Sequence, residues 1–450
     1  MPTQINNENK KLNFSNEREQ SQACLNSAEH EKNQGRKVLN VPNKREQNQT
    51  CLDSAEREGL RRKGNVPNLR FPEFQGEWEK CTLGDVSEFS KERVNTQNLS
   101  SDNYVATENM LQDYQGIIEA LSVPTNTNVI KFNKGDVLLS NIRPYLKKVW
   151  FADKNGGCSA DVFVFRALSV CIPDFLHYII ANDRFINFAM SGAKGVKMPR
   201  GDKEQMKTYE IGLPSIEEQK KMAKLLSLLD ERIATQIKII EDLKKLKSAI
   251  SKLLFTRKDL LETTIRLADI ATLKNGYAFQ SGKYNILGKW KIITIANVSG
   301  GRYINEEDCN CIINLPNDIQ DHQVLKEGDI LISLTGNVGR VSLCKSGAYL
   351  LNQRVGLLQI EGKIDKEFLY QVLSSRRFEN SMVACGQGAA QMNISKGDVE
   401  NFVLPYSSNA NNIHLVARIL HSYDECIINE LRELTLLTMQ KQYFLAKMFI

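Results

Sequence analysis

The chain has 450 residues, a formal net charge of +6 and a sequence pI ≈ 8.6. This length allows two or three domains, and the small excess of basic residues is compatible with nucleic acid without requiring it. No apolar run approaches the ~18 residues that span a membrane, and no apolar signal core opens the sequence, so we expect a cytoplasmic protein without membrane contact. Ten cysteines, none in a Cys-x-x-Cys pair, are expected to be reduced thiols.

Residues 1–68 have the composition of an unfolded chain. They contain one aromatic residue, Phe14, and are rich in Asn, Gln, Glu and Lys. Such a segment cannot bury enough apolar surface to order itself, so we expect a low-complexity, disordered extension. It also repeats itself, since the stretch 19–29 recurs with few changes at 46–56. A docking arm for a partner is the alternative interpretation.

Residues 69–212 predict a first α/β domain, of roughly 135 residues in its patterned part and large enough for its own core. Val137–Ser140 is expected to form a strand. Two further apolar runs, Val149–Phe151 and Val162–Phe165, flank Asn155-Gly156-Gly157, and this pattern predicts a hairpin. Pro173 is expected to open a short helix that continues to Phe185, because proline is well tolerated in the first turn.

Residues 213–258 predict one long helix. Ser215 is a natural N-cap, and Glu218 three residues later can complete a capping box. About 39 helical residues at ~1.5 Å each give a rod roughly 58 Å long, far longer than an ordinary core helix. Apolar residues recur at spacings of three and four, so the rod needs a partner for its apolar stripe. The stripe consists of Met222, Leu225, Leu226, Leu229, Ile233, Ile237, Ile240, Leu243, Leu246, Ile250 and Leu253.

The second half of the chain repeats the first. Phe175-Leu176 corresponds to Phe368-Leu369, and Asp230 corresponds to Asp424, with nearly the same offset. Residues 259–404 are therefore predicted to form a second domain like the first. Residues 405–450 are predicted to form a second long helix, and its stripe is Val416, Leu420, Tyr423, Ile427, Leu431, Leu434 and Leu437.

The loops differ although the domains match. Ser140–Lys148 and Ser333–Arg340 occupy corresponding places and share little sequence. In a domain–helix–domain–helix order, two helices that bury their stripes against each other must run antiparallel. The predicted fold class is α/β, with two similar domains separated by two long antiparallel helices in a coiled coil, related by a pseudo-two-fold repeat. Divergent loops on a duplicated scaffold would offer two different recognition surfaces.

This layout, together with several phrases in the same order, resembles the specificity subunit of a type I restriction–modification system. The resemblance covers about residues 69–450. The phrases are Trp78 followed by Leu83-Gly-Asp-Val86, Leu139-Ser-Asn-Ile-Arg-Pro-Tyr145, Leu213-Pro-Ser-Ile-Glu-Glu-Gln219, Asn275-Gly-Tyr-Ala-Phe279, Gly328-Asp-Ile-Leu331 with Thr335-Gly336, and Asn352-Gln353. Each phrase is weak alone, and their order within a duplicated frame is specific.

The resemblance implies that 69–212 and 259–404 are target recognition domains, each reading one half of a split site in double-stranded DNA. It implies that 213–258 and 405–450 are the central and C-terminal conserved helices, which hold these domains apart and dock partners. The expected partners are modification (methyltransferase) subunits, which methylate adenine, and a restriction (endonuclease) subunit. S-adenosylmethionine, ATP and magnesium are expected on those partners, with no cofactor in this chain.

Two stretches of the chain loosely resemble catalytic motifs. Asp329 with Glu361-Gly362-Lys363 resembles a metal-dependent nuclease pattern, but the first repeat has Ala167 and Ser169 at the last two positions. Gly276–Tyr284 departs from a phosphate loop in glycine spacing and lacks its Ser or Thr. The histidines (His30, His177, His322, His414 and His421) show no zinc spacing, so no metal site is expected. A metal-dependent endonuclease and a coiled-coil scaffold without DNA remain the alternatives.

Candidate DNA-binding side chains lie in Gly-rich loops, where cations neutralise phosphates and read guanine while amides bond adenine. In the first domain they are Arg143, Tyr145, Lys147 and Lys148 in one loop, and Lys194, Lys197 and Arg200 in a second. In the second domain they are Tyr277, Phe279, Gln280 and Lys283, then Thr335, Asn337 and Arg340, then Asn352, Gln353 and Arg354, and finally Gln387, Gln391 and Asn393. Each basic loop is equally compatible with a solvated surface, and Tyr145 and Phe279 with core positions.

Overall fold

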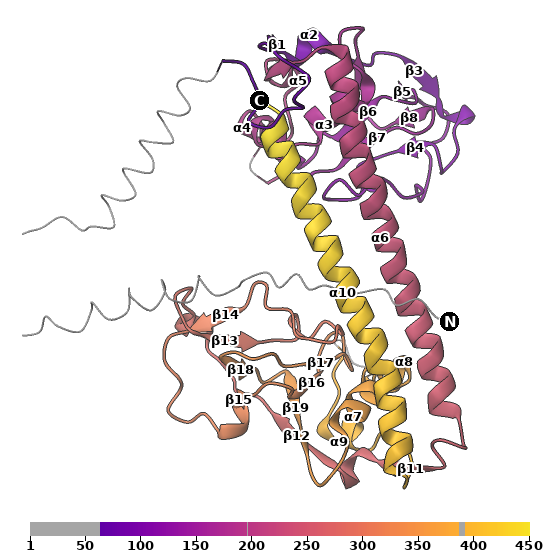
Figure 1. Ribbon diagram of the computed structural model, residues 1–450, viewed down its shortest axis with the longest axis vertical. Coiled ribbons are helices and arrows are strands. Elements are labelled where there is room, and N and C mark those ends of the chain that lie inside the picture. Colours follow the sequence, from indigo (N-terminus) through magenta and orange to yellow (C-terminus); the bar gives the residue numbers. More distant parts are fainter. Residues whose placement is uncertain (1–63, 196, 387–391) are drawn as a thin grey trace, which may run out of the picture. The chain divides into compact units, whose positions relative to one another are not determined.

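The computed structural model describes residues 64–195, 197–386 and 392–450 (Figure 1). Most of the extension expected at 1–68 therefore lies outside the described residues. Its last residues already belong to the compact unit 65–450, because the Asn65 amide donates to the Trp78 carbonyl oxygen at 2.5 Å and the Trp78 N–H donates back at 2.7 Å. Within the described ranges, no helix is long and apolar enough to cross a membrane, and the cysteines are free thiols.

The first repeat builds two four-stranded sheets and one two-stranded ladder. The strand orders are β2-β9-β6-β7, β3-β5-β8-β4 and β1-β10. Its strands are β1 (Glu79–Thr82), β2 (Ser87–Phe89), β3 (Arg93–Asn95), β4 (Tyr104–Val105), β5 (Asn128–Phe132), β6 (Val137–Ser140), β7 (Val149–Phe151), β8 (Gly156–Cys158), β9 (Val162–Ala167) and β10 (Glu210–Leu213). Its helices are α2 (Leu83–Val86), α3 (Pro173–Ile180), α4 (Asp183–Ser191) and α5 (Lys203–Lys207).

The second repeat has the same plan, with strand orders β12-β19-β16-β17, β14-β13-β18-β15 and β11-β20. Its strands are β11 (Thr263–Arg266), β12 (Ala271–Asn275), β13 (Trp290–Ile293), β14 (Asn310–Ile312), β15 (Val324–Leu325), β16 (Ile330–Ser333), β17 (Val341–Leu343), β18 (Tyr349–Leu351), β19 (Val355–Ile360) and β20 (Val403–Tyr406). Its helices are α7 (Lys366–Leu373), α8 (Arg376–Cys385) and α9 (Lys396–Glu400).

The sheets β3-β5-β8-β4 and β14-β13-β18-β15 differ at one edge. In each repeat the central strand, β8 or β18, has one parallel and one antiparallel neighbour. The outer strand is added beyond the antiparallel neighbour in the first repeat, where β3 pairs with β5, and beyond the parallel neighbour in the second, where β14 pairs with β13. The α/β scaffold is thus duplicated, and its outer parts have diverged as well as its loops.

The strand predicted at Val137–Ser140 is confirmed as β6, but the hairpin predicted around Asn155-Gly156-Gly157 is wrong. The central strand β6 lies between β7 and β9 and pairs antiparallel with both. The glycines belong to β8, in the other sheet. A Cβ at Gly156 would collide with the carbonyl oxygen of Asn103, and one at Gly157 would lie 2.6 Å from Leu99. These glycines permit close packing of the sheet and do not form a turn.

The single helix predicted from Pro173 to Phe185 is also wrong, because α3 ends at Ile180 and α4 begins at Asp183. Asn182 starts a new helix: its side-chain oxygen accepts a hydrogen bond from the N–H of Arg184 at 3.0 Å. Asparagine is among the preferred N-caps, and its cap geometry stops the preceding helix from continuing. The side-chain amide of Asn182 also donates to the carbonyl oxygen of Leu445 at 3.3 Å. Asn182, between the two helices, therefore also joins the domain to the C-terminal helix α10.

The two long helices are confirmed as α6 (Ile216–Thr256, 41 residues) and α10 (Ala410–Met448, 39 residues). They lie side by side and run antiparallel (Figure 1). Ser215 caps α6 as predicted, accepting from the Glu218 N–H at 3.4 Å. The predicted capping box does not form, because the buried Glu218 carboxylate accepts from both Arg70, at 2.7 Å, and Trp78, at 3.2 Å.

Two reciprocal ion pairs fix the register of α6 against α10. Lys441 on α10 lies 2.5 Å from Asp230 on α6, and Lys247 on α6 lies 2.5 Å from Asp424 on α10. Both the aspartates and the lysines differ by 194 in residue number, so one pair is the pseudo-two-fold copy of the other. Since each helix supplies one acid and one base, sliding by a helical turn would break both pairs.

The core of each domain is completed by the ends of both helices. In the first repeat the cluster includes Leu226, near the start of α6, and Phe449, beyond the end of α10, which stacks on Phe175 at 5.3 Å. In the second repeat Phe255, at the end of α6, packs edge-to-face on Phe368, with 6.5 Å between the ring centroids. Neither domain core is therefore complete without both helices.

The predicted apolar stripes are only partly buried. Leu226, Leu229 and Ile240 are buried, whereas Ile237, Leu246, Leu253 and Leu431 keep 43%, 47%, 60% and 41% of their surface exposed. A pair of helices covers a narrow seam of each partner, while stripe positions beside the seam stay in solvent. The partner helix therefore does not account for the whole stripe.

We expect the two ion pairs to differ in their contribution to stability. Asp424 is 8% exposed and also meets Arg302 at 3.0 Å, so Asp424→Asn removes a counter-charge from the partly buried Lys247 and Arg302. It should lower the free energy of unfolding by about 2–4 kcal/mol. Asp230 is 35% exposed, so Asp230→Asn should cost about 1 kcal/mol or less. Thermal unfolding midpoints measure both; an equal or larger loss for Asp230→Asn contradicts the assignment.

Candidate nucleic-acid interface

One end of the sheet β2-β9-β6-β7, and the same end of its counterpart β12-β19-β16-β17, gathers the loops that the sequence singled out. Strand β6 ends at Ser140, and its antiparallel neighbour β9 begins at Val162, so the loop after the first and the turn before the second lie at the same end. The same holds for Ser333, which ends β16, and Val355, which begins β19. Topology therefore brings separate polar loops onto one surface of each domain.

In the first repeat, two backbone hydrogen bonds join the loop after β6 to the loop between α4 and α5, and a third joins it to the turn before β9. The Arg143 N–H donates to the Pro199 oxygen at 2.8 Å, the Gly201 N–H to the Asn141 oxygen at 3.2 Å, and the Asn141 N–H to the Asp161 oxygen at 2.8 Å. We call this surface, formed by residues 141–148, 159–161, 192–195 and 197–202, the first platform. It is held by main-chain contacts.

The second repeat forms the same three bonds. The Gly336 N–H donates to the Met392 oxygen at 2.9 Å, the Ile394 N–H to the Leu334 oxygen at 2.9 Å, and the Leu334 N–H to the Arg354 oxygen at 3.0 Å. Every donor and acceptor lies 193 residues beyond its counterpart. This surface, residues 334–340, 352–354 and 392–395, is the second platform. The backbone is conserved between the repeats, and the side chains are not.

The loop after β6 contributes two kinds of side chain to the first platform. Tyr145 is 48% exposed, so the core alternative for it is not supported, and Arg143 is partly exposed. Lys147 is paired with Asp183 at 2.8 Å, and Lys148 donates to a backbone oxygen, that of Thr107, at 2.7 Å. These two lysines hold the loop against its own domain, which leaves Arg143 and Tyr145 as its better candidates for an external ligand.

The loop between α4 and α5 places its three predicted cations at the surface. Lys194 is 81% exposed and pairs with Asp202 at 2.6 Å; this hydrogen bond raises the pKa of the lysine and lowers the pKa of the aspartate. Arg200 is 56% exposed and lies 3.4 Å from Asp161, while Lys197 is exposed. The lysine thus stays charged, and the arginine is oriented by a carboxylate across the platform.

The second platform is richer in amides and hydroxyls. The Thr335 hydroxyl donates to the side-chain oxygen of Asn393 at 3.1 Å, and the same two residues form a backbone bridge. Arg340 is partly exposed, with Glu379 at 3.9 Å. Of the other candidates, Asn337, Gln353 and Arg354 are exposed and Asn352 is partly buried. Gln387 and Gln391 lie outside the described residues.

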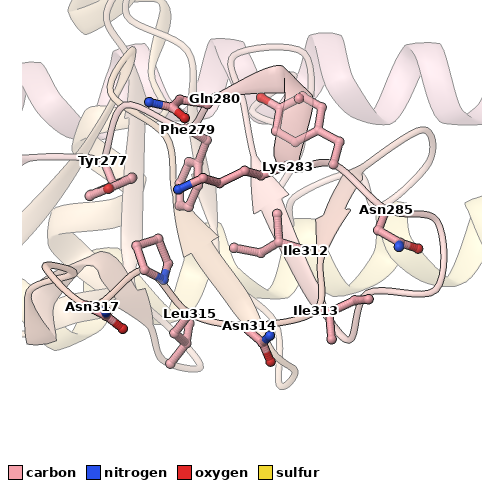
Figure 2. A pocket seen from close by; sticks show the side chains of 13 residues that line it. Tyr277, Phe279, Gln280, Lys283, Asn285, Ile312, Ile313, Asn314, Leu315 and Asn317 are labelled. Atoms are coloured by element: carbon pink, nitrogen blue, oxygen red, sulfur yellow. The ribbon is translucent and has the colours of Figure 1, made fainter.

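A further loop, residues 277–283, is hydrogen-bonded to the second platform. It lines a cavity of ≈ 450 Å³ (Figure 2). Tyr277 accepts a backbone hydrogen bond from Gln353 at 3.0 Å, and its ring lies 4.9 Å from the ring of Phe279. The Tyr277 hydroxyl bonds Asp318 at 2.8 Å, which raises the pKa of the tyrosine. Phe279 packs partly against a small apolar cluster, while Gln280 and Lys283 are exposed at the rim. The structure therefore brings all four candidates of this loop together.

Sequence reasoning missed two residues of the first platform, Asn141 and Asp161. Asn141 takes part in two of the three platform bonds, and Asp161 accepts one of those two and also pairs with Arg200. The signal was present in the repeat, because they align with Leu334 and Arg354 at the offset of 193. An aspartate opposite an arginine at matched positions marks a place where the two surfaces differ in charge.

The residues of the nuclease alternative have structural roles away from the platforms. Asp329 accepts from the Lys326 N–H at 2.8 Å and closes a turn, as Asp136 does by accepting from the Asn133 N–H at 2.8 Å in the first repeat. Glu361 accepts from the Thr272 hydroxyl at 2.6 Å. Among the residues described, no three His, Cys, Asp or Glu side chains gather where they could hold a metal ion. The nuclease interpretation thus finds no support here.

Comparison with known proteins agrees with this architecture. A family model of the type I restriction modification DNA specificity domain matches residues 75–245 and 262–438. The chain is 29% identical over 367 residues to the type I restriction enzyme MjaVIII specificity subunit of Methanocaldococcus jannaschii, covering 75% of this chain and 83% of that protein. It is 26% identical over 249 residues to the putative MjaX specificity subunit of the same organism, covering 52% and 57%.

Two solved structures share the fold. One is the S subunit of a type I restriction–modification system from M. genitalium, with a TM-score of 0.53, 18% identity and coverage of 86% of this chain and 99% of that one. The other, from a study of complex assembly in the type I system, has a TM-score of 0.50, 20% identity and coverage of 82% and 97%.

Cations on the platforms should contribute to duplex DNA binding through released counterions. Replacing Lys197 or Arg340 with Ala should weaken binding and reduce the slope of log affinity against log salt by about 1 if the side chain contacts a phosphate. A base contact would instead relax one position of the bound motif by about 1–3 kcal/mol. Titration of labelled duplex at several salt concentrations measures both.

The matched control is Lys363→Ala. Lys363 is exposed in the turn after β19. This turn lies at the end of the sheet β12-β19-β16-β17 that is opposite to the second platform. Its loss should leave the salt slope unchanged. Equal slopes for all three variants and the wild type would show that the platforms do not face DNA.

Proposed function

This chain belongs to the type I restriction modification DNA specificity family, and from that premise we propose that it selects a split DNA site for a type I restriction–modification complex. One observation carries the proposal: two platforms share three backbone hydrogen bonds at one offset but present different side chains. One scaffold used twice with different surfaces suits a protein that reads two unlike half-sites.

Each platform combines the two kinds of contact that sequence recognition needs. Cations at the surface, such as the exposed Lys197 and the partly exposed Arg340, suit phosphates, which position a protein on the duplex. Arg200 and Asn393 carry groups with two hydrogen-bonding atoms, which can distinguish base edges in the major groove. Since the ends of α6 and α10 complete both domain cores, the helix pair couples the two reading surfaces.

In this proposal the chain targets chemistry that its partners perform. Modification subunits would bring S-adenosylmethionine and methylate adenine, and a restriction subunit would bring ATP and magnesium for cleavage. Ile237, Leu246, Leu253 and Leu431 offer exposed apolar area on the helices for docking those subunits, which accounts for the stripe positions that the helix pair leaves uncovered.

Selection from random DNA pools, with the partner methyltransferase present, tests the proposal. Enrichment of two short fixed sequences separated by an unread spacer supports it. Metal-dependent cutting by this chain alone would favour the nuclease, and a stable complex that enriches no sequence would favour a scaffold without DNA.

Exchanging one domain should change one half of the recognised motif. Replacing residues 263–403 with the equivalent domain of a relative keeps the whole of α6 and α10 and replaces the second platform. We expect a new sequence in one half-site, with the other half-site and the spacer unchanged, when methylated positions are mapped by sequencing. Changes in both halves would refute one platform per half-site.

Lengthening both helices should lengthen the spacer. Gln236 on α6 donates to the backbone oxygen of Glu430 on α10 at 3.1 Å, so insertions after Ile237 and near Leu431 meet across the pair. Four added residues in each helix extend the pair by ~6 Å. At ~3.4 Å per base pair, the mapped spacer should grow by about 1–2 base pairs.

The control inserts two residues at the same places. Two residues rotate each stripe by roughly 200° and should break the helix pair, seen as lost solubility or lost partner docking. A four-residue variant that stays folded and active but keeps the original spacer would show that the helices do not set it.

A further inference from the structure

Arg143 occupies a backbone conformation that favours glycine. Its φ is +52°, and its counterpart in the second repeat is Gly336, with φ +73°. An L-residue with a side chain is strained there, and such strain is held by the surrounding structure. Here the clamp is the bond from the Arg143 N–H to Pro199 and the one it accepts from Leu146 at 2.9 Å. The arginine is retained where glycine would fit better, which indicates a role for its side chain.

Arg200 comes from the other loop of the same platform. It forms a backbone bridge with Ile142, the residue before Arg143, and its side chain is 56% exposed with Asp161 at 3.4 Å. The two arginines thus come from the two loops that the platform bonds join. A guanidinium can donate two parallel hydrogen bonds to the O6 and N7 acceptors of guanine, and a carboxylate beside it fixes the plane of the fork.

The second platform has different chemistry at the same positions. Thr335 replaces Ile142, Gly336 replaces Arg143 and Asn393 replaces Arg200, each 193 residues later. Thr335 is only 9% exposed, and its hydroxyl donates to the side-chain oxygen of Asn393. That bond leaves the amide N–H₂ and one oxygen lone pair of the exposed Asn393 available. One donor beside one acceptor matches N7 and the N6 amino group of adenine.

We propose that the two platforms read different bases at equivalent positions. Arg200, with Arg143 from the adjoining loop, reads guanine in the half-site of the first repeat, while Asn393, positioned by Thr335, reads adenine in the half-site of the second. This inference rests on the proposed function and adds to it the base class that each half-site carries.

The test moves the second platform's chemistry onto the first. The double substitution Ile142→Thr with Arg200→Asn places a threonine–asparagine pair on a backbone that already makes the same bonds. The selected motif of the complex with its methyltransferase is then compared with the wild type. We expect guanine to be replaced by adenine at one position of the first half-site, with a preference change of about 5- to 150-fold, and no change in the second half-site.

The reciprocal substitution, Asn393→Arg, should shift one position of the second half-site from adenine towards guanine. Lys134→Ala is the matched control, because Lys134 is exposed in the turn before β6. This turn lies at the end of the sheet β2-β9-β6-β7 that is opposite to the first platform. It should leave both half-sites as they are.

Arg143→Gly supplies a second, independent readout. Because Gly336 adopts the same backbone conformation, this variant should fold and melt at a temperature equal to or above that of the wild type. Its guanine preference in the first half-site should fall, with the second half-site unaffected. It also decides the question if the double substitution does not fold.

The outcomes separate the inference from the function beneath it. An unchanged first half-site in the double substitution, or in Arg143→Gly if the double variant is unfolded, overturns the base assignment while the targeting function stands. A wild-type complex that selects no motif overturns the targeting function itself.

Discussion

The reciprocal aspartate–lysine pairs between α6 and α10 are the constraint on which the remaining architecture depends. Each helix offers an acid near one end and a base near the other, so Asp230 meets Lys441 and Lys247 meets Asp424. Apolar seams tolerate slippage because one leucine packs much like another, whereas a partly buried charge without its partner is costly. Charged pairs at both ends therefore select one register. That register brings Phe255 and Phe449 to the domain cores that they complete.

The two junctions between helices and domains are related but unequal. At the first, Asp230 also accepts a hydrogen bond from the Tyr178 hydroxyl at 2.9 Å, and burial together with this carboxylate raises the pKa of the tyrosine. At the second, Asp424 accepts from Arg302 and from the amide of Gln371, the counterpart of Tyr178. Asp230 thus has one neutral donor from its domain, whereas Asp424 has two donors from its domain, one of which is a guanidinium. The Asp424 carboxylate therefore contacts more charged partners than the Asp230 carboxylate, and removing Asp424 unbalances more partners than removing Asp230.

The sequence predicted features that depend on periodicity and failed where local signals have several causes. The long helices and the duplicated domains follow from apolar spacing and from a constant offset, which persist however the domains pack. Asn155-Gly156-Gly157 has the composition of a turn, but its glycines are required by close contact with Asn103 and Leu99, which only the folded sheet reveals. The exposed candidates Lys194 and Arg200 lie at the surface as expected, yet the partners of Lys147 and Lys148 are distant in sequence and could not be anticipated. Asp161 was missed because a single aspartate in a turn carries no pattern of its own.

The platforms separate the stability of the reading surface from its specificity. Their three shared hydrogen bonds join main-chain groups, so they persist when Ile142 is exchanged for Thr335 or Arg200 for Asn393. A loop held by its side chains would have to alter its own support each time its surface changed. A loop held by its backbone can accept new side chains while its position stays fixed. The left-handed site of Arg143 and Gly336 marks the limit of that freedom, because there the backbone favours one residue type. An arginine at that position is therefore the part of the first platform that most needs a functional reason.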